Sequence, residues 1–235
     1  MKETNYWIKI KWISKYIIVA THWAWDDINT DLLTEIVARK LWAFAIINNK
    51  FFKPTSPLRN VYPDYAEDFN RLPFLIWSNE YDWTRKKKEM NEFYCDLEEC
   101  VIEAKQYSNC SKAIIIHIHW MRNDWNNWID IWIWMNFKWR KVKSSSRLNL
   151  ILWKETLSVK LANDMKDSLN RHLNSFWLFA NIWENFNAQY KCFWIQYSKV
   201  IENDIFQLEI CRELREEHNL DTVTGILGKV ILEIF

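Results

Sequence analysis

The chain contains 17 tryptophans and only two glycines among its 235 residues. Average usage would place about sixteen glycines in this length. Glycine accepts positive φ and close approach of the backbone, so a chain this poor in glycine has few ordinary ways to build tight turns. Tryptophan stands where glycine is favoured, as at Trp23 and Trp25, which directly follow the apolar run 16–21. The distribution of these two residue types therefore constrains every prediction about the fold.

Two hypotheses explain the tryptophans. In the first, many of them stand for glycine, as happens when a gene with a reassigned UGA codon is translated with the wrong table. The sequence context favours glycine at Trp7, Trp12, Trp23, Trp25, Trp42, Trp120, Trp125, Trp128, Trp132, Trp134, Trp139 and Trp183. The context does not distinguish glycine from tryptophan at Trp77, Trp83, Trp153, Trp177 and Trp194. In the second hypothesis the protein is tryptophan-rich and uses its indoles as stacking platforms for sugars or bases.

Bulk properties indicate one domain covering residues 1–235 and an ordinary apolar core, since 49% of the residues are hydrophobic. The net charge of +1 argues against a polyanion-binding surface. Met1–Lys11 alternates charged and apolar residues, unlike a secretory signal, and no segment approaches the roughly 18 apolar residues of a membrane span. The five cysteines form no C-x-x-C pair, which is typical of reduced thiols. We therefore expect a cytoplasmic protein that binds neither nucleic acid nor membranes.

Short apolar runs alternate with helical patterns along the chain, which predicts an α/β sheet protein. The expected strands are Tyr16–Thr21, Phe44–Asn48, Ala113–His119, Trp128–Trp134 and Asp204–Ile210. The expected helices cover about 32–41, 84–107, 155–173 and 221–235, the first of them preceded by the capping candidates Asn29, Thr30 and Asp31. A long proline-containing connection follows the second strand, and loops of this length are commonly functional.

Polar side chains stand at the carboxyl ends of two of these strands. His22 and Asp27 follow the first strand, and His119 ends the third. Ligands bind at this edge in open α/β sheets. Two histidines and a carboxylate, with a fourth position left for water, are the composition of a catalytic zinc site. The alternative is that each histidine is a satisfied polar residue at a strand end. His117 shares a strand face with His119 and could be a ligand, although a supporting or packing role fits it better.

Glu209 lies on the last predicted strand, where apolar residues alternate with Gln207 and Glu209. Two polar groups therefore share one face of an apolar strand. A carboxyl group held there beside a metal can act as general base for a metal-activated water. The alternative is an ion pair between Glu209 and Arg212 or Arg215.

Substrate recognition is predicted in the proline-containing connection. Asn70 and Arg71 stand side by side there, and a guanidinium group makes a planar two-point contact with a carboxylate. Arg59 is a weaker candidate for the same task. Residues 137–143 interleave aromatic and basic side chains, as in proteins that bind single-stranded nucleic acid. With glycine at position 139, that segment becomes an ordinary basic loop.

When tryptophan is read as glycine, five motifs follow one another along the chain. They are T-H-G-A-G-D-D, D-F-N-R, H-I-H-G-M-R-N-D, G-I-D-I-G-I-G and Q-L-E-I, which begin at Thr21, Asp68, His117, Trp128 and Gln207. The series resembles the N-formylglutamate amidohydrolase family, which is related to zinc carboxypeptidases and poly-γ-glutamate hydrolases. The resemblance extends from about residue 17 to residue 215 and implies a three-layer αβα sandwich with a mixed central sheet.

The resemblance also implies a metal centre and its ligands. His22 corresponds to the first zinc ligand and His119 to the last. Asp27 resembles the acidic ligand, with Asp26 as the alternative.

Further roles follow from the same resemblance. Glu209 resembles the catalytic carboxylate, Asn70 and Arg71 resemble a clamp for the substrate carboxylate, and Asp130 orients a ligand or shapes the site. The implied activity is zinc-dependent hydrolysis of a C–N amide bond in a small acidic substrate, such as an N-acyl amino acid or a γ-glutamyl compound. The alternative is a non-catalytic binding module, either a degenerate relative of the hydrolase or an aromatic-rich binder of sugars or nucleic acid.

Overall fold

The computed structural model describes residues 1–22, 27–53, 55–66, 69, 87–121, 129–132, 156–182 and 203–235. The strands within them are β1 (Lys2–Glu3), β2 (Trp7–Ile10), β3 (Tyr16–Ala20), β4 (Phe44–Asn48), β5 (Ile114–Met121), β6 (Ile129–Trp132), β7 (Ala180–Ile182) and β8 (Asp204–Cys211). The α-helices are α1 (Thr30–Lys40), α2 (Lys87–Ser108), α4 (Val159–Leu173) and α6 (Glu217–Ile234). Short 3₁₀ helices are η1 (Pro57–Asn60), η2 (Pro63–Tyr65), η3 (Asn174–Phe176) and η4 (Glu213–Arg215).

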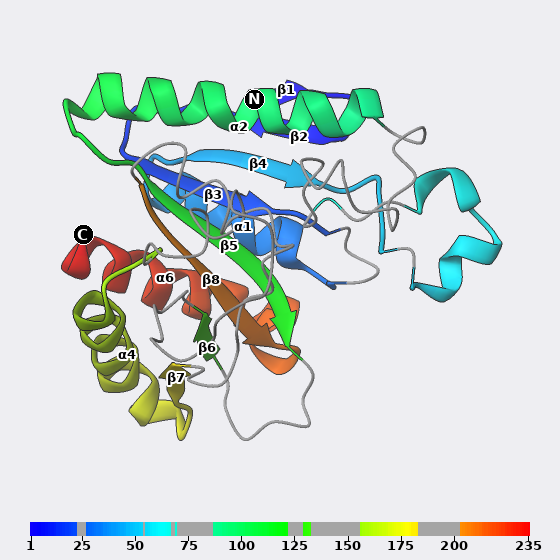
Figure 1. The fold of residues 1–235 in the computed structure, drawn as a ribbon. Helices are drawn as coiled ribbons and strands as arrows, with labels where there is room; N and C mark the ends of the chain where they lie inside the picture. Colours follow the sequence, from blue (N-terminus) through cyan, green and yellow to red (C-terminus); the bar gives the residue numbers. More distant parts are fainter. Residues whose placement is uncertain are drawn as a thin grey trace, which may run out of the picture.

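The eight strands form one mixed sheet in the order β1-β2-β4-β3-β5-β8-β6-β7 (Figure 1). The four central strands β4, β3, β5 and β8 are parallel. On one side β2 runs antiparallel to β4 and β1 antiparallel to β2, and on the other side β6 runs antiparallel to β8 and parallel to β7. The carboxyl ends of the central strands therefore meet along one edge of the sheet.

Helices cover both faces of the sheet. Successive side chains of a strand point to opposite faces, and the buried core accordingly divides into two clusters. Ile17 and Val19 of β3 pack in one cluster with α2, whereas Ile18 and Ala20 pack in the other with α1, α4 and α6. In Figure 1, α2 lies along the top and α1 and α6 pass behind the strands. The predicted three-layer αβα sandwich with a mixed sheet is confirmed.

Helix α2 illustrates why these residues form this layer. Its buried side chains recur at helical spacing and form one apolar stripe, made of Phe93, Leu97, Cys100, Val101 and Ala104. Ile102, next to Val101 in the sequence, points away from the stripe and is exposed.

No helix within the described ranges is long and apolar enough to cross a lipid bilayer.

Strand β2 was not predicted, because a charged residue interrupts its apolar pattern. Lys9 is only 2% exposed, and its Nζ lies 2.7 Å from Oδ1 of Asp96 on α2. The Tyr6 hydroxyl donates a 2.9 Å hydrogen bond to the other oxygen of Asp96. A lysine in such a position looks exposed in the sequence, whereas its partner on a helix nearly 90 residues away allows burial. The short strands β1 and β7 were also missed.

Two helix boundaries differ from the prediction. Helix α4 begins at Val159 rather than at 155, because Ser158 caps it by accepting a 3.2 Å hydrogen bond from the amide of Leu161. Helix α6 begins at Glu217, four residues before the predicted start. At the start of α1, Asn29 occupies the N-cap position, but its side chain donates to the main-chain oxygen of Arg215 instead of capping the helix.

Replacing Leu97 by alanine should lower the free energy of unfolding by about 2–5 kcal/mol, because it leaves a cavity between α2 and the sheet. Ile102→Ala on the exposed side of the same helix is the matched control and should change it by less than about 0.5 kcal/mol. Urea unfolding followed by circular dichroism measures both. Equal effects of the two substitutions would contradict the packing of α2 described above.

Candidate metal centre

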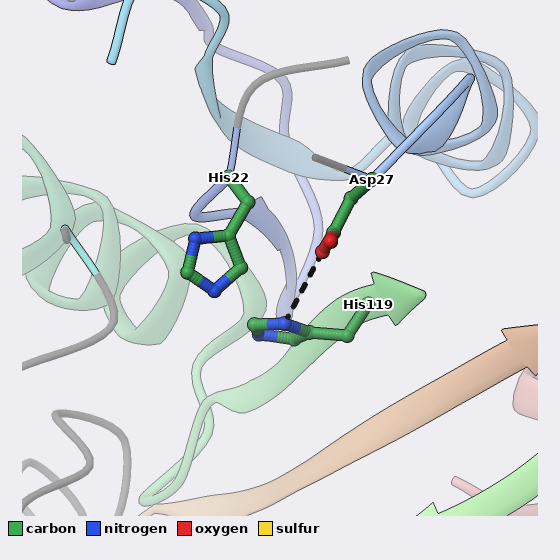
Figure 2. A group of neighbouring side chains, drawn as sticks. All are labelled: His22, Asp27 and His119. Atoms are coloured by element: carbon green, nitrogen blue, oxygen red, sulfur yellow. Dashed lines mark ion pairs between the residues drawn. The ribbon is translucent and has the colours of Figure 1, made fainter. Parts of the chain in front are cut away.

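Three side chains from separate parts of the sequence meet at the carboxyl edge of the sheet. His22 lies just after β3, Asp27 precedes α1, and His119 lies in β5. One ligand atom of each lies within 4.8 Å of the others. The residues are 2%, 1% and 3% exposed, respectively. Figure 2 shows the Asp27 carboxylate pointing toward the His119 ring, with the His22 ring beside both.

The His119 imidazole is held on both of its nitrogen atoms. Nδ1 lies 3.5 Å from Oδ2 of Asp27, and Nε2 lies 3.1 Å from the hydroxyl of Thr21. Either ring nitrogen can carry the proton of a neutral imidazole, and the other nitrogen is then free to bind a metal ion. A proton on Nε2, donated to Thr21, would leave Nδ1 as the ligand atom on the side of Asp27. The His22 ring lies across that of His119, with the ring centroids 4.9 Å apart and an angle of 74° between the planes.

Asp27 is a buried carboxylate with a cation beside it. Nζ of Lys53 lies 3.2 Å from Oδ1, and the amide of Trp120 donates a 3.4 Å hydrogen bond to Oδ2. Burial alone would raise the pKa of Asp27, but the charge of Lys53 and the neighbouring histidines outweigh it, so the pKa lies well below its usual range. Asp27 is therefore ionised, as a metal ligand must be.

His22 and His117 are neutral. Burial holds the pKa of His22 well below its ordinary value, and the nearby charge of Lys53 lowers it further. Burial does the same to the pKa of His117, which is fully buried with its ring centroid 6.3 Å from that of His119. Neutral imidazole is the form of histidine that binds metals.

Strand register brings Glu209 beside this cluster. Glu209 of β8 pairs with His119 of β5 on one side and with Asp130 of β6 on the other, so the three side chains share one face of the sheet. Burial raises the pKa of Glu209 to about 8, and the charge of Asp27 contributes in the same direction. The amide of Gln207 donates to Oε1 of Glu209. A carboxyl group with a pKa this close to neutrality can both accept and release a proton at physiological pH.

Arg215 binds main-chain oxygens rather than Glu209. Its Nε donates a 3.0 Å hydrogen bond to the oxygen of Ile210, and Nη1 donates to the oxygen of Ile28. The side chain is 1% exposed. Arg215 therefore ties the end of β8, which carries Glu209, to the segment that carries Asp27.

The remaining predicted site residues lie outside the described residues or away from the buried cluster. Asp26, Asn70 and Arg71 lie outside the described residues, so their roles stay predictions. Arg59 lies in η1 and is exposed, unlike the buried cluster. Lys53 was not among the predicted site residues, because no motif marks it. Its position after β4, at the same edge of the sheet as His22, is the signal that would have found it.

The donor chemistry of the cluster fits a transition metal. Two imidazoles and a carboxylate suit zinc and similar divalent ions better than Mg²⁺ or Ca²⁺, which prefer oxygen ligands throughout. His22, Asp27 and His119 would hold the ion.

No protein-family model and no curated protein matches the sequence. Solved structures do match the fold. An N-formylglutamate amidohydrolase from Ralstonia eutropha JMP134 is 17% identical, with a TM-score of 0.55 over 97% of this chain and 96% of that one. The chain has the fold of N-formylglutamate amidohydrolase. The resemblance inferred from the motifs is thus confirmed at the level of the fold.

Two further structures share this fold. A gene product from Agrobacterium tumefaciens is 11% identical, with a TM-score of 0.55 over 95% of this chain and 91% of that one. A succinylglutamate desuccinylase from Vibrio parahaemolyticus is 13% identical, with a TM-score of 0.51 over 94% of this chain and 57% of that one. At these identities the likeness concerns architecture alone.

The raised pKa of Glu209 predicts a pH-dependent stability difference in metal-free protein. The folded state keeps the Glu209 proton up to about pH 8, whereas the unfolded chain releases it near 4.5, so stability is lost as the pH rises through this window. Glu209→Gln removes this loss, and its free energy of unfolding should rise relative to the wild type by about 2–4 kcal/mol across the window. Urea unfolding of chelator-treated protein at several pH values measures the difference.

Glu217→Gln, which removes an exposed carboxylate at the start of α6, is the control for the loss of one charge. A difference between Glu209→Gln and the wild type that stays constant with pH would show that Glu209 titrates normally.

Proposed function

We propose that the protein is a zinc-dependent hydrolase that cleaves a C–N amide bond in a small acidic substrate, such as an N-acyl amino acid or a γ-glutamyl compound. The observation that carries this proposal is the convergence of His22, Asp27 and His119 beside Glu209 at the carboxyl edge of the sheet. The fold shared with an N-formylglutamate amidohydrolase supports the same reaction class.

Zinc is the metal proposed for the cluster, because two histidines and a carboxylate leave one position open in a tetrahedral site. When bound there, zinc supplies a Lewis acid that lowers the pKa of water toward about 7 and polarises the substrate carbonyl. Asp27 and the two histidines would hold the ion. Nζ of Lys53 lies 3.2 Å from Oδ1 of Asp27, whereas Oδ2 is the oxygen that lies 3.5 Å from Nδ1 of His119.

Glu209 is the proposed proton carrier. Its carboxylate accepts a proton from the attacking water and then donates it to the departing amine, so that the carbonyl carbon gains a hydroxyl group as the C–N bond breaks. Gln207 fixes the orientation of the carboxyl group through its hydrogen bond to Oε1. The pKa of about 8 in the metal-free site shows how strongly burial favours the protonated form that the second step requires.

Recognition of the substrate carboxylate is assigned to Asn70 and Arg71, in accordance with the family resemblance. Arg59, exposed on η1, is the alternative cation. Cytoplasmic location, a small-molecule partner in place of nucleic acid or membrane, and a single domain over residues 1–235 stay predictions from the sequence. A non-catalytic binding module is the competing proposal, and metal content together with turnover separates the two.

Metal content and turnover should respond differently to two substitutions. His119→Ala removes a ligand and should lower bound zinc from about one ion per chain to almost none, with loss of activity. Glu209→Gln should keep the zinc while turnover falls by about 10²–10⁴-fold. Elemental analysis and an assay against N-acyl and γ-glutamyl compounds measure the two effects.

His218→Ala is the control for these substitutions, since His218 is an exposed histidine on α6. Full activity in Glu209→Gln would remove Glu209 from the mechanism, and unchanged zinc in His119→Ala would reject the ligand set.

The clamp is tested by changing the two candidate arginines separately. Arg71→Ala should raise KM by about 10–100-fold with little change in kcat, because a charged hydrogen-bonding partner of the substrate carboxylate is lost. Arg59→Ala should leave KM unchanged. The reverse outcome would assign the clamp to Arg59, and an unchanged KM in both variants would exclude this mode of recognition.

A further inference from the structure

We infer that residues 42 and 177, written as tryptophan, are glycine in the protein that the native cell makes. Both positions have positive φ, 52° at Trp42 and 60° at Trp177. The left-handed region brings Cβ too close to the following carbonyl oxygen, so bulky residues rarely occupy it, whereas glycine enters it freely. This observation concerns the backbone alone and does not depend on the proposed function.

The conformation at residue 42 ends helix α1 in a defined way. Its amide donates a 3.3 Å hydrogen bond to the oxygen of Arg39, and the amide of Ala43 donates a 2.8 Å bond to the oxygen of Ala38. These two bonds, directly after the C-cap Leu41, make a Schellman motif. The residue in the left-handed conformation of this motif is usually glycine.

The same hydrogen-bond pattern recurs at the end of η3, the 3₁₀ helix that continues α4. The amide of residue 177 donates a 3.1 Å bond to the oxygen of Asn174, and the amide of Leu178 donates a 3.2 Å bond to the oxygen of Leu173. Two helix ends of identical construction therefore carry tryptophan at the glycine position.

A third helix end shows the ordinary alternative to glycine. Asn109, with a φ of 47°, ends α2, and the amide of Cys110 donates a 3.2 Å bond to the oxygen of Lys105. Asparagine tolerates the left-handed region because its short polar side chain can bond locally. Tryptophan has no such compensation.

Packing of the indole does not offset the backbone cost at residue 177. Trp177 is 91% exposed, so it buries little apolar surface, whereas Trp42 is 59% exposed. The Trp42 ring contacts the Trp12 ring, with the centroids 4.9 Å apart. The buried indole N–H of Trp12 has no hydrogen-bond partner among the described residues, although buried indoles usually have one.

The two written glycines do not occupy left-handed positions. Gly225 and Gly228 both lie inside α6, and neither has positive φ. In the described part of the chain, the written glycines thus stand where the backbone does not require glycine, and two of the tryptophans stand where it does. A UGA codon translated as glycine accounts for this arrangement and for the composition together. The same reading would place glycine at Trp120, beside the metal-ligand cluster.

Protein isolated from the native cells tests the inference directly. The tryptic peptide Leu41–Lys50 contains residue 42, and His172–Lys191 contains residue 177. Mass spectrometry should find glycine at both positions, and the gene should have UGA at both codons. Tryptophan in these peptides, or UGG in the gene, would overturn the inference.

A stability comparison tests the backbone argument in recombinant protein. Trp42→Gly should melt about 2–4 °C above Trp42→Ala, and Trp177→Gly should exceed Trp177→Ala by a similar amount, because only alanine retains the Cβ that opposes positive φ. Trp7, in β2 with ordinary φ, is the control position, where Trp7→Gly should melt below Trp7→Ala. If alanine equals or exceeds glycine at positions 42 and 177, these positions do not require glycine and the inference fails.

Discussion

The alternation of side chains along β5 and β8 is the constraint on which the rest of the site depends. Ile116 and Ile118 of β5, with Leu208 of β8, are buried against the layer of α1, α4 and α6. Their neighbours His119 and Glu209 must therefore point to the opposite face, and the register of the two strands places them side by side. A shift of one residue would turn both polar groups into the apolar layer. The apolar core thus fixes the geometry of the polar site, although none of its side chains takes part in the proposed reaction.

The second constraint on the site is the burial of the charged Asp27 carboxylate. Asp27 is 1% exposed, and an isolated carboxylate there would be strongly destabilising. Lys53 and the amide of Trp120 stabilise its charge, whereas burial and the charge of Asp27 favour the protonated form of Glu209. Two carboxyl groups in one buried site are driven toward opposite protonation states, which is the arrangement that acid–base chemistry uses.

The sequence predicted the parts of this structure that local pattern determines. The uninterrupted apolar runs of β3, β4 and β5 could be recognised because buried parallel strands need no polar face. The grouping of His22, Asp27 and His119 could be predicted from these strands, since the carboxyl ends of parallel strands meet at one edge of the sheet. Lys53 was missed although its place after β4 pointed to the same edge. Lys9 could not be predicted in this way, because its burial is explained by a carboxylate far away in the sequence, that of Asp96. Pairings of this kind exist only once the chain has folded.

The composition of the chain and the metal centre are connected through residue 120, which contributes to the cluster with its backbone. Its amide donates to Oδ2 of Asp27, and glycine has the same amide, so the ligand geometry does not depend on which side chain is present. The indole of Trp120 instead faces Arg215, whose Cζ lies 6.0 Å from the ring centroid. Arg215 is itself anchored to the main-chain oxygens of Ile28 and Ile210, so its position does not depend on the indole either. Reading residue 120 as glycine therefore changes the space beside the cluster while it leaves the ligands, and the hydrogen bonds that hold them, in place.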